Sequence, residues 1–341
     1  MARIDLPAVT QWISAAAHEH GGHLAAHLMT RLSISRRIAN KLIAKLVQAQ
    51  WLASVGTPRR PHHTAGALRQ VVRRYLLSGL EEDLPWARDF APFFALRPNV
   101  ARLVQHAFTE LLNNAVDHSG GTSVTVSLRQ TAAHVQLLVS DDGRGIFDRI
   151  AEAFDIDDPA TAMLELGKGK LTSDPERHSG RGLFFSSRLA DVFDLHANAR
   201  AFQQRAWDGH RWMPGRAMDR QGTSIYLAIA LDTVRTLDEV LRQHSTDGRG
   251  VAFDATSVPL QLLTGDQVGL ESRAQARRVV QRLGSFRRAE LDFGGVGEVG
   301  HGFTDELFRV FSRQHPGVEL VPVRMAPRVA EMVDAVRSGA A

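Results

Sequence analysis

Apolar side chains recur at helical spacing in the first part of the chain. The pattern predicts one amphipathic helix over Leu6 to Ala17, a break at Gly21-Gly22 and a second helix over His23 to Leu32. Ser33-Ile34-Ser35 then reads as a turn that ends at a helix N-cap. In the third helix, Ile38, Leu42, Ile43 and Leu46 face inward, and the polar positions between them are exposed.

A hairpin with a basic turn follows this third helix. Trp51 to Val55 form its first strand, and Gly56 to Arg60 form the turn. In this order the segment 1–66 resembles a winged helix-turn-helix domain. The resemblance implies that the third helix enters the major groove of duplex DNA, while the hairpin touches the backbone or the minor groove. The residues it places near DNA are Ser35, Arg36, Arg37, Asn40, Lys41, Arg59 and Arg60.

The charge distribution agrees with a nucleic-acid partner. Residues 1–74 contain 11 Lys and Arg against only Asp5 and Glu19, a net charge of +9, which leaves 30 against 35, or −5, for the remainder. Neutralising phosphates supplies most non-specific DNA affinity, so we expect duplex DNA as the partner. Winged helices also serve as protein-docking modules, and the sequence leaves that alternative open.

A connector is predicted over residues 67–94. Val71 to Leu80 reads as helical, and Glu81 to Pro85 mark a charged break after it. The aromatic cluster that follows is expected to pack the connector onto the next domain, and its members are Trp86, Phe90, Phe93 and Phe94.

Acid and amide side chains then share one face of a predicted helix. Glu110, Asn113, Asn114 and Asp117 stand at i, i+3, i+4 and i+7. The opposite face is apolar and would pack on a sheet. Taken alone this is a common amphipathic pattern, but such a face can also hold a metal ion and a water.

Three glycine-containing segments follow in a fixed order. The strand Val135 to Val139 leads into Asp141-Asp142-Gly143-Arg144-Gly145-Ile146, and the second segment is His178-Ser179-Gly180-Arg181-Gly182-Leu183. A helix over Phe184 to Phe193 would place backbone N–H groups at its start, where phosphate binds well. The third segment, Gly222-Thr223, opens a strand.

This set resembles the GHKL ATP-binding family of DNA gyrase, MutL proteins, histidine kinases and anti-sigma serine kinases, over about residues 95 to 230. The resemblance implies that Glu110 polarises the attacking water, Asn114 binds Mg²⁺ and Asp141 accepts the adenine amino group. Asn113 and Asp117 would line the pocket less directly. The other cofactor-binding residues that it implies are Gly143, Gly145, Ile146, Ser179, Gly180, Arg181, Gly182, Leu183 and Thr223.

Magnesium chemistry suits these residue types. Mg²⁺ takes oxygen ligands, and an amide oxygen, phosphate oxygens and waters complete its shell. A carboxylate one helical turn away can orient water for attack on the γ-phosphate. Phe147 to Arg177 would be a mobile lid, whose cations Lys168, Lys170 and Arg177, with His178, meet either the triphosphate or solvent.

Strands and helices alternate in the last third. The pattern predicts strands at Val251 to Asp254, Arg288 to Phe293 and Val318 to Pro322. The predicted helices between and after them are Arg273 to Leu283, Phe303 to Arg313 and Pro327 to Val336. Leu291 to Val296 and Gly300 to Leu307 resemble a STAS-like domain, the class that includes anti-sigma factor antagonists.

One departure from that class concerns phosphorylation. Those antagonists carry a phosphorylatable serine in the turn before the helix, where this chain has Gly300-His301-Gly302. The serine switch is therefore doubtful. Thr304 is expected to be a structural cap at the helix start. His301 is kept as a candidate ligand, although a turn histidine without a second ligand is usually surface.

The whole chain is thus predicted to be a multidomain α+β protein. Its parts are a winged-helix domain (1–66), a helical connector (67–94), a GHKL α/β sandwich (95–235) and a STAS-like α/β domain (247–341). The chain has no cysteine, and it shows neither a long apolar run nor a signal-peptide pattern. We therefore expect a cytoplasmic protein without a membrane partner. A homodimer agrees with both resemblances, although no heptad is visible.

Two classes of function compete. In the first, a DNA-binding transcriptional regulator uses Mg-ATP binding or slow hydrolysis to switch its domain arrangement. In the second, an anti-sigma-like kinase or sequestering switch acts on a regulatory protein partner. A gyrase-like or MutL-like enzyme is not expected, because the sequence shows no transducer or cleavage module. A sensor histidine kinase is not expected either, because His106 lies within the helix of the ATP site.

Overall fold

The computed structural model describes residues 4–57, 59–81, 83–172, 179–264 and 269–339. The chain divides into two compact units. The first contains the residues up to Gly143 together with Asp191–Phe193 and Gly222–Val234. The second contains Arg144–Ala190, Asp194–Gln221 and the residues from Arg235 onward.

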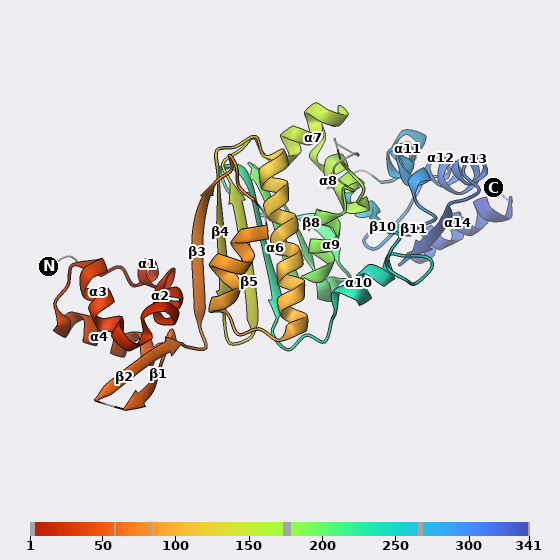
Figure 1. Ribbon diagram of the computed structural model, residues 1–341. Helices are drawn as coiled ribbons and strands as arrows, with labels where there is room; N and C mark the ends of the chain where they lie inside the picture. Colours follow the sequence, from red (N-terminus) through yellow and green to blue (C-terminus); the bar gives the residue numbers. More distant parts are fainter. Residues whose placement is uncertain (1–3, 58, 82, 173–178, 265–268, 340–341) are drawn as a thin grey trace. The chain divides into compact units, whose positions relative to one another are not determined.

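Helices and a hairpin form the amino-terminal part of the first unit (Figure 1). These elements are α1 (Leu6–Thr10), α2 (Ile13–His20), a 3-10 turn (Gly21–His23), α3 (Leu24–Leu32), α4 (Arg36–Gln48), β1 (Leu52–Thr57) and β2 (Arg60–Ala65). Ser35 caps α4 as predicted, accepting a hydrogen bond from the Ile38 N–H at 3.4 Å. The order of helices followed by a hairpin agrees with the predicted winged helix, although α1 and α2 stand where one helix was predicted.

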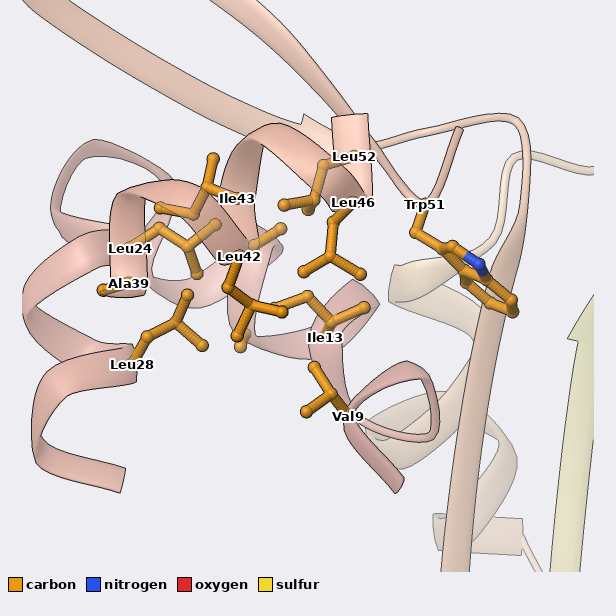
Figure 2. Close-up of a cluster of buried hydrophobic side chains, with 12 residues drawn as sticks. Val9, Ile13, Leu24, Leu28, Ala39, Leu42, Ile43, Leu46, Trp51 and Leu52 are labelled. Carbon is orange, nitrogen blue, oxygen red and sulfur yellow. The ribbon is translucent and has the colours of Figure 1, made fainter. Parts of the chain in front are cut away.

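The single helix predicted over Leu6 to Ala17 is wrong. The chain breaks between α1 and α2, because the Gln11 carbonyl accepts a hydrogen bond from Val72 N–H at 3.1 Å instead of continuing one helix. Figure 2 shows the core that these helices enclose, in which Ile13, Leu28 and Leu46 are fully buried. The predicted inward-facing apolar positions are therefore confirmed, whereas the predicted helix boundary is wrong.

The predicted helix over Val71 to Leu80 is also wrong. This segment is β3 (Arg69–Leu76), an antiparallel partner of β4 (Ser123–Gln130), in a register that pairs Val71 with Leu128. Its two adjacent valines suit a pleated strand better than a helix. Its partner lies some fifty positions further along the chain, and local spacing cannot reveal it.

An antiparallel sheet and one long helix complete the first unit (Figure 1). The strand order is β3, β4, β5 (His134–Asp141) and β9 (Arg220–Ala230). The helix α6 (Pro98–His118) packs on β5 through its apolar face. Before it come α5 (Asp83–Pro85), a π-helical turn (Trp86–Phe90) and a 3-10 turn (Ala91–Phe93). The predicted aromatic packing is confirmed for Trp86 and Phe90, whose ring centroids lie 5.4 and 5.1 Å from that of Phe108 of α6. The Phe93 ring instead lies 5.5 Å from the ring of His18 in α2.

The second unit begins with the segment predicted to be the lid. Its first elements are α7 (Ile146–Phe154), α8 (Pro159–Lys168), α9 (Gly182–Leu189), β7 (Arg200–Arg205), a 3-10 turn (Ala206–Asp208) and β8 (Arg211–Pro214). The strand β6 (Val192–Asn198) begins in the first unit and ends in the second. The helix predicted over Phe184 to Phe193 therefore ends early, because the Asp191 N–H bonds to Ala228 O of β9 and the chain becomes extended.

A three-stranded parallel sheet forms the core of the carboxyl-terminal part. Its strand order is β10 (Ala255–Pro259), β11 (Arg288–Asp292) and β12 (Glu319–Val323). The helices of this part are α10 (Leu237–Gln243), α11 (Arg273–Val280), α12 (His301–Asp305), α13 (Ser312–Gln314) and α14 (Pro327–Ser338). A π-helical turn (Glu306–Phe311) joins α12 to α13, and 3-10 turns cover Leu260–Leu263 and Leu283–Ser285.

Two boundaries here differ from the prediction. Val251 to Asp254 is not a strand, because the Asp254 carboxylate accepts hydrogen bonds from the backbone and hydroxyl of Thr246, which closes a turn. Thr304 is not the helix cap, because α12 already begins at His301. The Thr304 hydroxyl instead donates to Gly300 O within the helix.

Candidate nucleotide-binding site

The polar face of α6 lies beside its apolar face as the spacing predicts. Glu110, Asn113 and Asn114 are half-buried, and Asp117 is exposed. The Asn113 Oδ1 atom is buried and has no hydrogen-bond partner among the described residues. Buried polar atoms are nearly always paired in folded proteins, so this oxygen is suited to a ligand, a water or a cation.

The end of β5 places Asp141 in a defined hydrogen-bond frame. Its Oδ1 accepts from the Gly143 N–H at 2.9 Å and from the Thr223 N–H at 3.1 Å. Its Oδ2 accepts none of the hydrogen bonds described for this residue. Burial raises the pKa of the Asp141 carboxyl, and the two backbone N–H groups oppose that rise. One oxygen is thus fixed by the backbone, and the other is left for a donor such as an exocyclic amino group.

Two glycines allow the surrounding segments to approach closely. A Cβ on Gly143 would lie 2.2 Å from Ser119 O at the end of α6. A Cβ on Gly222 would lie 2.3 Å from Asp141 O, and the φ of Gly222 is +89°. Only glycine fits such contacts and such a backbone conformation without strain. These glycines therefore bring the end of α6, the end of β5 and the beginning of β9 together around Asp141.

Asp142 and the serines beside it are supporting residues that the sequence argument did not assign. The Asp142 carboxylate accepts four hydrogen bonds from the backbone and hydroxyls of Thr122 and Ser123, which hold its pKa well below the usual range. The hydroxyls of Ser140 and Ser224 lie 2.5 Å apart. The sequence signal for the supporting role of Asp142 was the pair of adjacent acids before a glycine. Neighbouring side chains at a strand end point to opposite faces, so only one of the two acids can face the pocket.

The second unit contains further residues that were predicted to bind nucleotide, Gly145 at the adenine pocket and Gly180 and Gly182 at the phosphates. Gly145 has a φ of +87° and precedes α7, which starts at Ile146. Gly180 also has a positive φ, Gly182 begins α9, and Leu183 is buried within it. Arg181 is half-buried and Ser179 is exposed. His178, like Arg177, lies outside the described residues.

The lid lysines have protein partners in the structure. The Lys168 side chain is 1% exposed, and its ammonium is bonded to the Glu165 carboxylate, to Arg278 O at 3.1 Å and to Gln281 O at 3.0 Å. Lys170 Nζ donates to Ser285 O at 2.6 Å. For Lys168 to contact a triphosphate, these buried interactions would have to break. The predicted nucleotide contact of Lys168 is therefore disfavoured in this conformation.

A magnesium ion would depend on few protein ligands at this site. Among the described residues, no group of three or more histidine or acidic side chains is arranged to hold a metal ion. The amide oxygens of α6 nevertheless fit the oxygen preference of Mg²⁺. Asn114 would hold the ion, and nucleotide phosphates and waters would complete its shell.

Comparison with known families agrees with this site. Residues 99–262 match the family described as histidine kinase-, DNA gyrase B- and HSP90-like ATPase, and residues 275–330 match a STAS-like domain of unknown function. The chain therefore contains an ATP-binding domain of the GHKL class followed by a STAS-like domain. The predicted GHKL and STAS-like resemblances are confirmed, and the winged-helix resemblance stays a prediction.

A curated relative matches over a shorter stretch. The sensor histidine kinase YvrG of Bacillus subtilis (strain 168) is 31% identical over 124 residues, which are 35% of this chain and 18% of that protein. The chain thus spans about a fifth of the relative that it matches. None of the helices in the described ranges has both the length and the apolar character needed to cross a bilayer.

Proposed function

We propose that this protein is a transcriptional regulator that binds duplex DNA through its amino-terminal domain and is switched by Mg-ATP. The observation that carries the proposal is the outer face of α4. Arg36, Arg37, Asn40 and Lys41 are all exposed there, together with Lys45 one turn later. The helix contains no acidic residue.

The packing of α4 supports this orientation. Its opposite side supplies Ala39, Leu42 and Leu46 to the core in Figure 2, so the cationic face is directed toward solvent. Arg59 and Arg60 are exposed at the turn between β1 and β2. The major groove of duplex DNA admits an α-helix, and a basic hairpin beside that helix can contact the backbone.

The amino-terminal domain is joined to the ATPase sheet by hydrogen bonds. Val72 N–H of β3 donates to Gln11 O at 3.1 Å, and Gln70 N–H donates to the Ser14 hydroxyl at 3.2 Å. The strand β3 lies two strands from β5, which ends at Asp141. A nucleotide-dependent change at Asp141 therefore has a continuous hydrogen-bonded route to the helices that support α4.

Nucleotide binding is assigned to the face of α6 and the end of β5. Asp141 Oδ2 would accept the adenine amino group, and Asn114 would hold Mg²⁺, with the unpartnered Asn113 oxygen nearby. Glu110 would orient the attacking water, so that slow hydrolysis resets the switch. These roles rest on the family match together with the hydrogen-bond frame around Asp141.

A second candidate is a switch that acts on a protein partner, and the STAS-like domain favours it. Phosphorylation of that domain at Thr304 is not supported, because Thr304 is 1% exposed and its hydroxyl bonds to Gly300 O. In this second function, the protein would therefore sequester its partner or phosphorylate a residue of another chain. Absence of DNA binding in every nucleotide state would make it the better proposal.

The deciding experiment measures affinity for duplex DNA without nucleotide, with ADP and with a non-hydrolysable ATP analogue, at fixed magnesium and salt. We expect the affinity to differ between these states. Replacing Arg36 and Arg37 with alanine should weaken binding and reduce the slope of log affinity against log salt by about 2. The matched control, Arg97→Ala with Arg313→Ala, removes the same charge from exposed positions outside α4 and should leave binding unchanged. Equal affinity of wild type and the Arg36/Arg37 variant would show that α4 is not the recognition helix.

A further inference from the structure

A cavity of about 400 Å³ lies in the second unit, among residues that the ATP-site assignment does not use, apart from Lys170. Its lining comes from the end of the lid segment, from the chain after α11 and from the end of the π-helical turn with the residues after α13. The lining residues are Lys170, Val280, Arg282, Gly284, Ser285, Phe311 and His315. Pockets of 300 to 1,000 Å³ are typical of small-molecule sites.

The lining combines cations with an aromatic surface. Lys170 and Arg282 carry positive charge, and no carboxylate belongs to the lining. The rings of Phe311 and His315 have centroids 4.5 Å apart with an interplanar angle of 31°. One part of the cavity thus suits an anionic group, and another part suits a flat or apolar body.

Lys170 is the least compensated of these cations. It forms no ion pair among the described residues, and its Nζ donates to Ser285 O and stands 4.1 Å from the centroid of the Phe286 ring. Burial lowers the pKa of the Lys170 ammonium, and the nearby Arg181 lowers it further. An anion in the cavity would raise the pKa of the Lys170 ammonium again, because a nearby negative charge stabilises the charged form.

Arg282 is held beside Lys170 by the fold. One of its nitrogens donates to Glu165 at 3.2 Å, and the other is bonded to Lys170 O. Its φ of +66° is uncommon for a residue with a side chain. Residues in such conformations persist where the surrounding structure specifies them, and they concentrate at ligand sites.

We infer that this cavity binds a small organic anion, with its phosphate or carboxylate group at Lys170 and Arg282 and an aromatic or apolar body against Phe311 and Val280. Apart from Lys170, its lining residues are not among those predicted to bind nucleotide, and Asp141 and Thr223 of the predicted adenine pocket belong to the first unit. The proposal does not depend on DNA binding, because no residue of α4 lines the cavity.

The test is calorimetric titration of the full chain with Mg²⁺ and a saturating non-hydrolysable ATP analogue, so that the adenine pocket is filled. The probes are phenyl phosphate, inorganic phosphate and benzyl alcohol. We expect phenyl phosphate to bind at least about tenfold more tightly than either of the others, because only it offers both the charge and the ring. Equal affinity for phenyl phosphate and inorganic phosphate would overturn the assignment of the aromatic surface, and absence of phenyl phosphate binding at millimolar concentration would overturn the site.

Variants locate the binding. A Cβ on Gly284 would lie 3.4 Å from His315 Nδ1, an ordinary contact, so Gly284→Leu should fold while filling the cavity. The Gly284→Leu and Lys170→Met variants should each bind phenyl phosphate about tenfold or more weakly than wild type. Arg313→Gln removes a neighbouring exposed charge that does not line the cavity and should have no effect. If Gly284→Leu lowers the melting temperature, His315→Ala replaces it. Unchanged affinity in Lys170→Met and in the cavity variant would refute the proposal.

Discussion

Lys168→Met tests whether the lid lysine is structural, as its burial indicates. Lys168 and Glu165 form an ion pair whose side chains are 1% and 0% exposed. The Lys168 ammonium also donates to two carbonyls at the end of α11, those of Arg278 in its last turn and Gln281 just after it. Methionine has a similar length but no charge and no donor, so it removes these interactions with little change in volume.

The expected loss follows from what remains buried. Within the described part of the chain, Glu165 would keep only Arg282, at 3.2 Å, and two carbonyl oxygens would lose a donor. Removing one partner of a buried pair typically costs about 3 to 5 kcal/mol of unfolding free energy, and we expect a loss in this range. Replacing both partners, with Lys168→Met and Glu165→Leu, should recover part of it, because the buried Glu165 carboxylate is then absent, although Arg282 also loses its ion-pair partner. Lys170→Met loses one half-exposed carbonyl bond and should cost only about 1 kcal/mol.

Urea unfolding followed by tryptophan fluorescence is the assay. The Trp212 ring is buried and lies close to Gly167, next to Lys168, where a Cβ would be 3.3 Å from Trp212 Cδ1. Its emission should therefore respond to unfolding of this region. A loss below about 1 kcal/mol in Lys168→Met, together with weaker ATP binding, would refute the reasoning. That result would mean that Lys168 leaves its buried partners and reaches the triphosphate.

Three further predictions concern the nucleotide site and the core. Asn114→Ala should abolish Mg-ATP binding in calorimetry, whereas Glu110→Ala should preserve binding and slow phosphate release; equal ATP affinity for wild type and Asn114→Ala would disprove the metal assignment. Gly222→Ala should lower the melting temperature, because its Cβ would meet a backbone oxygen at 2.3 Å with φ at +89°, whereas Gly317→Ala, with nothing within 4 Å, should not. Burial lowers the pKa of His244 to about 3, whereas the unfolded chain has the ordinary value of 6.5. Between these two pH values only the unfolded chain binds a proton at His244, so the free energy of unfolding falls as the pH drops below 6.5. Wild type should accordingly lose about 2 kcal/mol more than His244→Phe between pH 7 and pH 5 in urea unfolding, and equal losses would contradict the assignment.

Local chemistry accounts for the features that the sequence predicted well. The Ser35 cap, the apolar stripe of α4 and the strand β5 all depend on hydrogen bonds or spacing within a few residues. The face of α6 follows from the helical period in the same way. Glycine and acid patterns pointed to Asp141 and to the Gly222-Thr223 segment, because close backbone approach requires residue types that are visible in the sequence.

Partners distant in the sequence account for the features that were missed. Val71 to Leu80 has a helical spacing of apolar residues, but β4 supplies the hydrogen bonds that make it a strand. Gln11 ends a helix because its carbonyl pairs with β3. In both places a tertiary hydrogen bond outweighs a local preference of less than about 1 kcal/mol per residue.

By itself, the sequence determined the GHKL and STAS-like domain types, the cationic face of α4 and the polar face of α6 that is proposed to bind nucleotide, because each is encoded in short-range periodicity or in residue chemistry. Only the tertiary structure decided which groups the lid cations contact. Lys168 and Gln281 are 113 positions apart, and their contact depends on how α8 packs against β10 and the chain after α11. A lysine in a polar loop and a lysine in a core look alike in sequence, because burial is set by the surrounding elements and not by the residue.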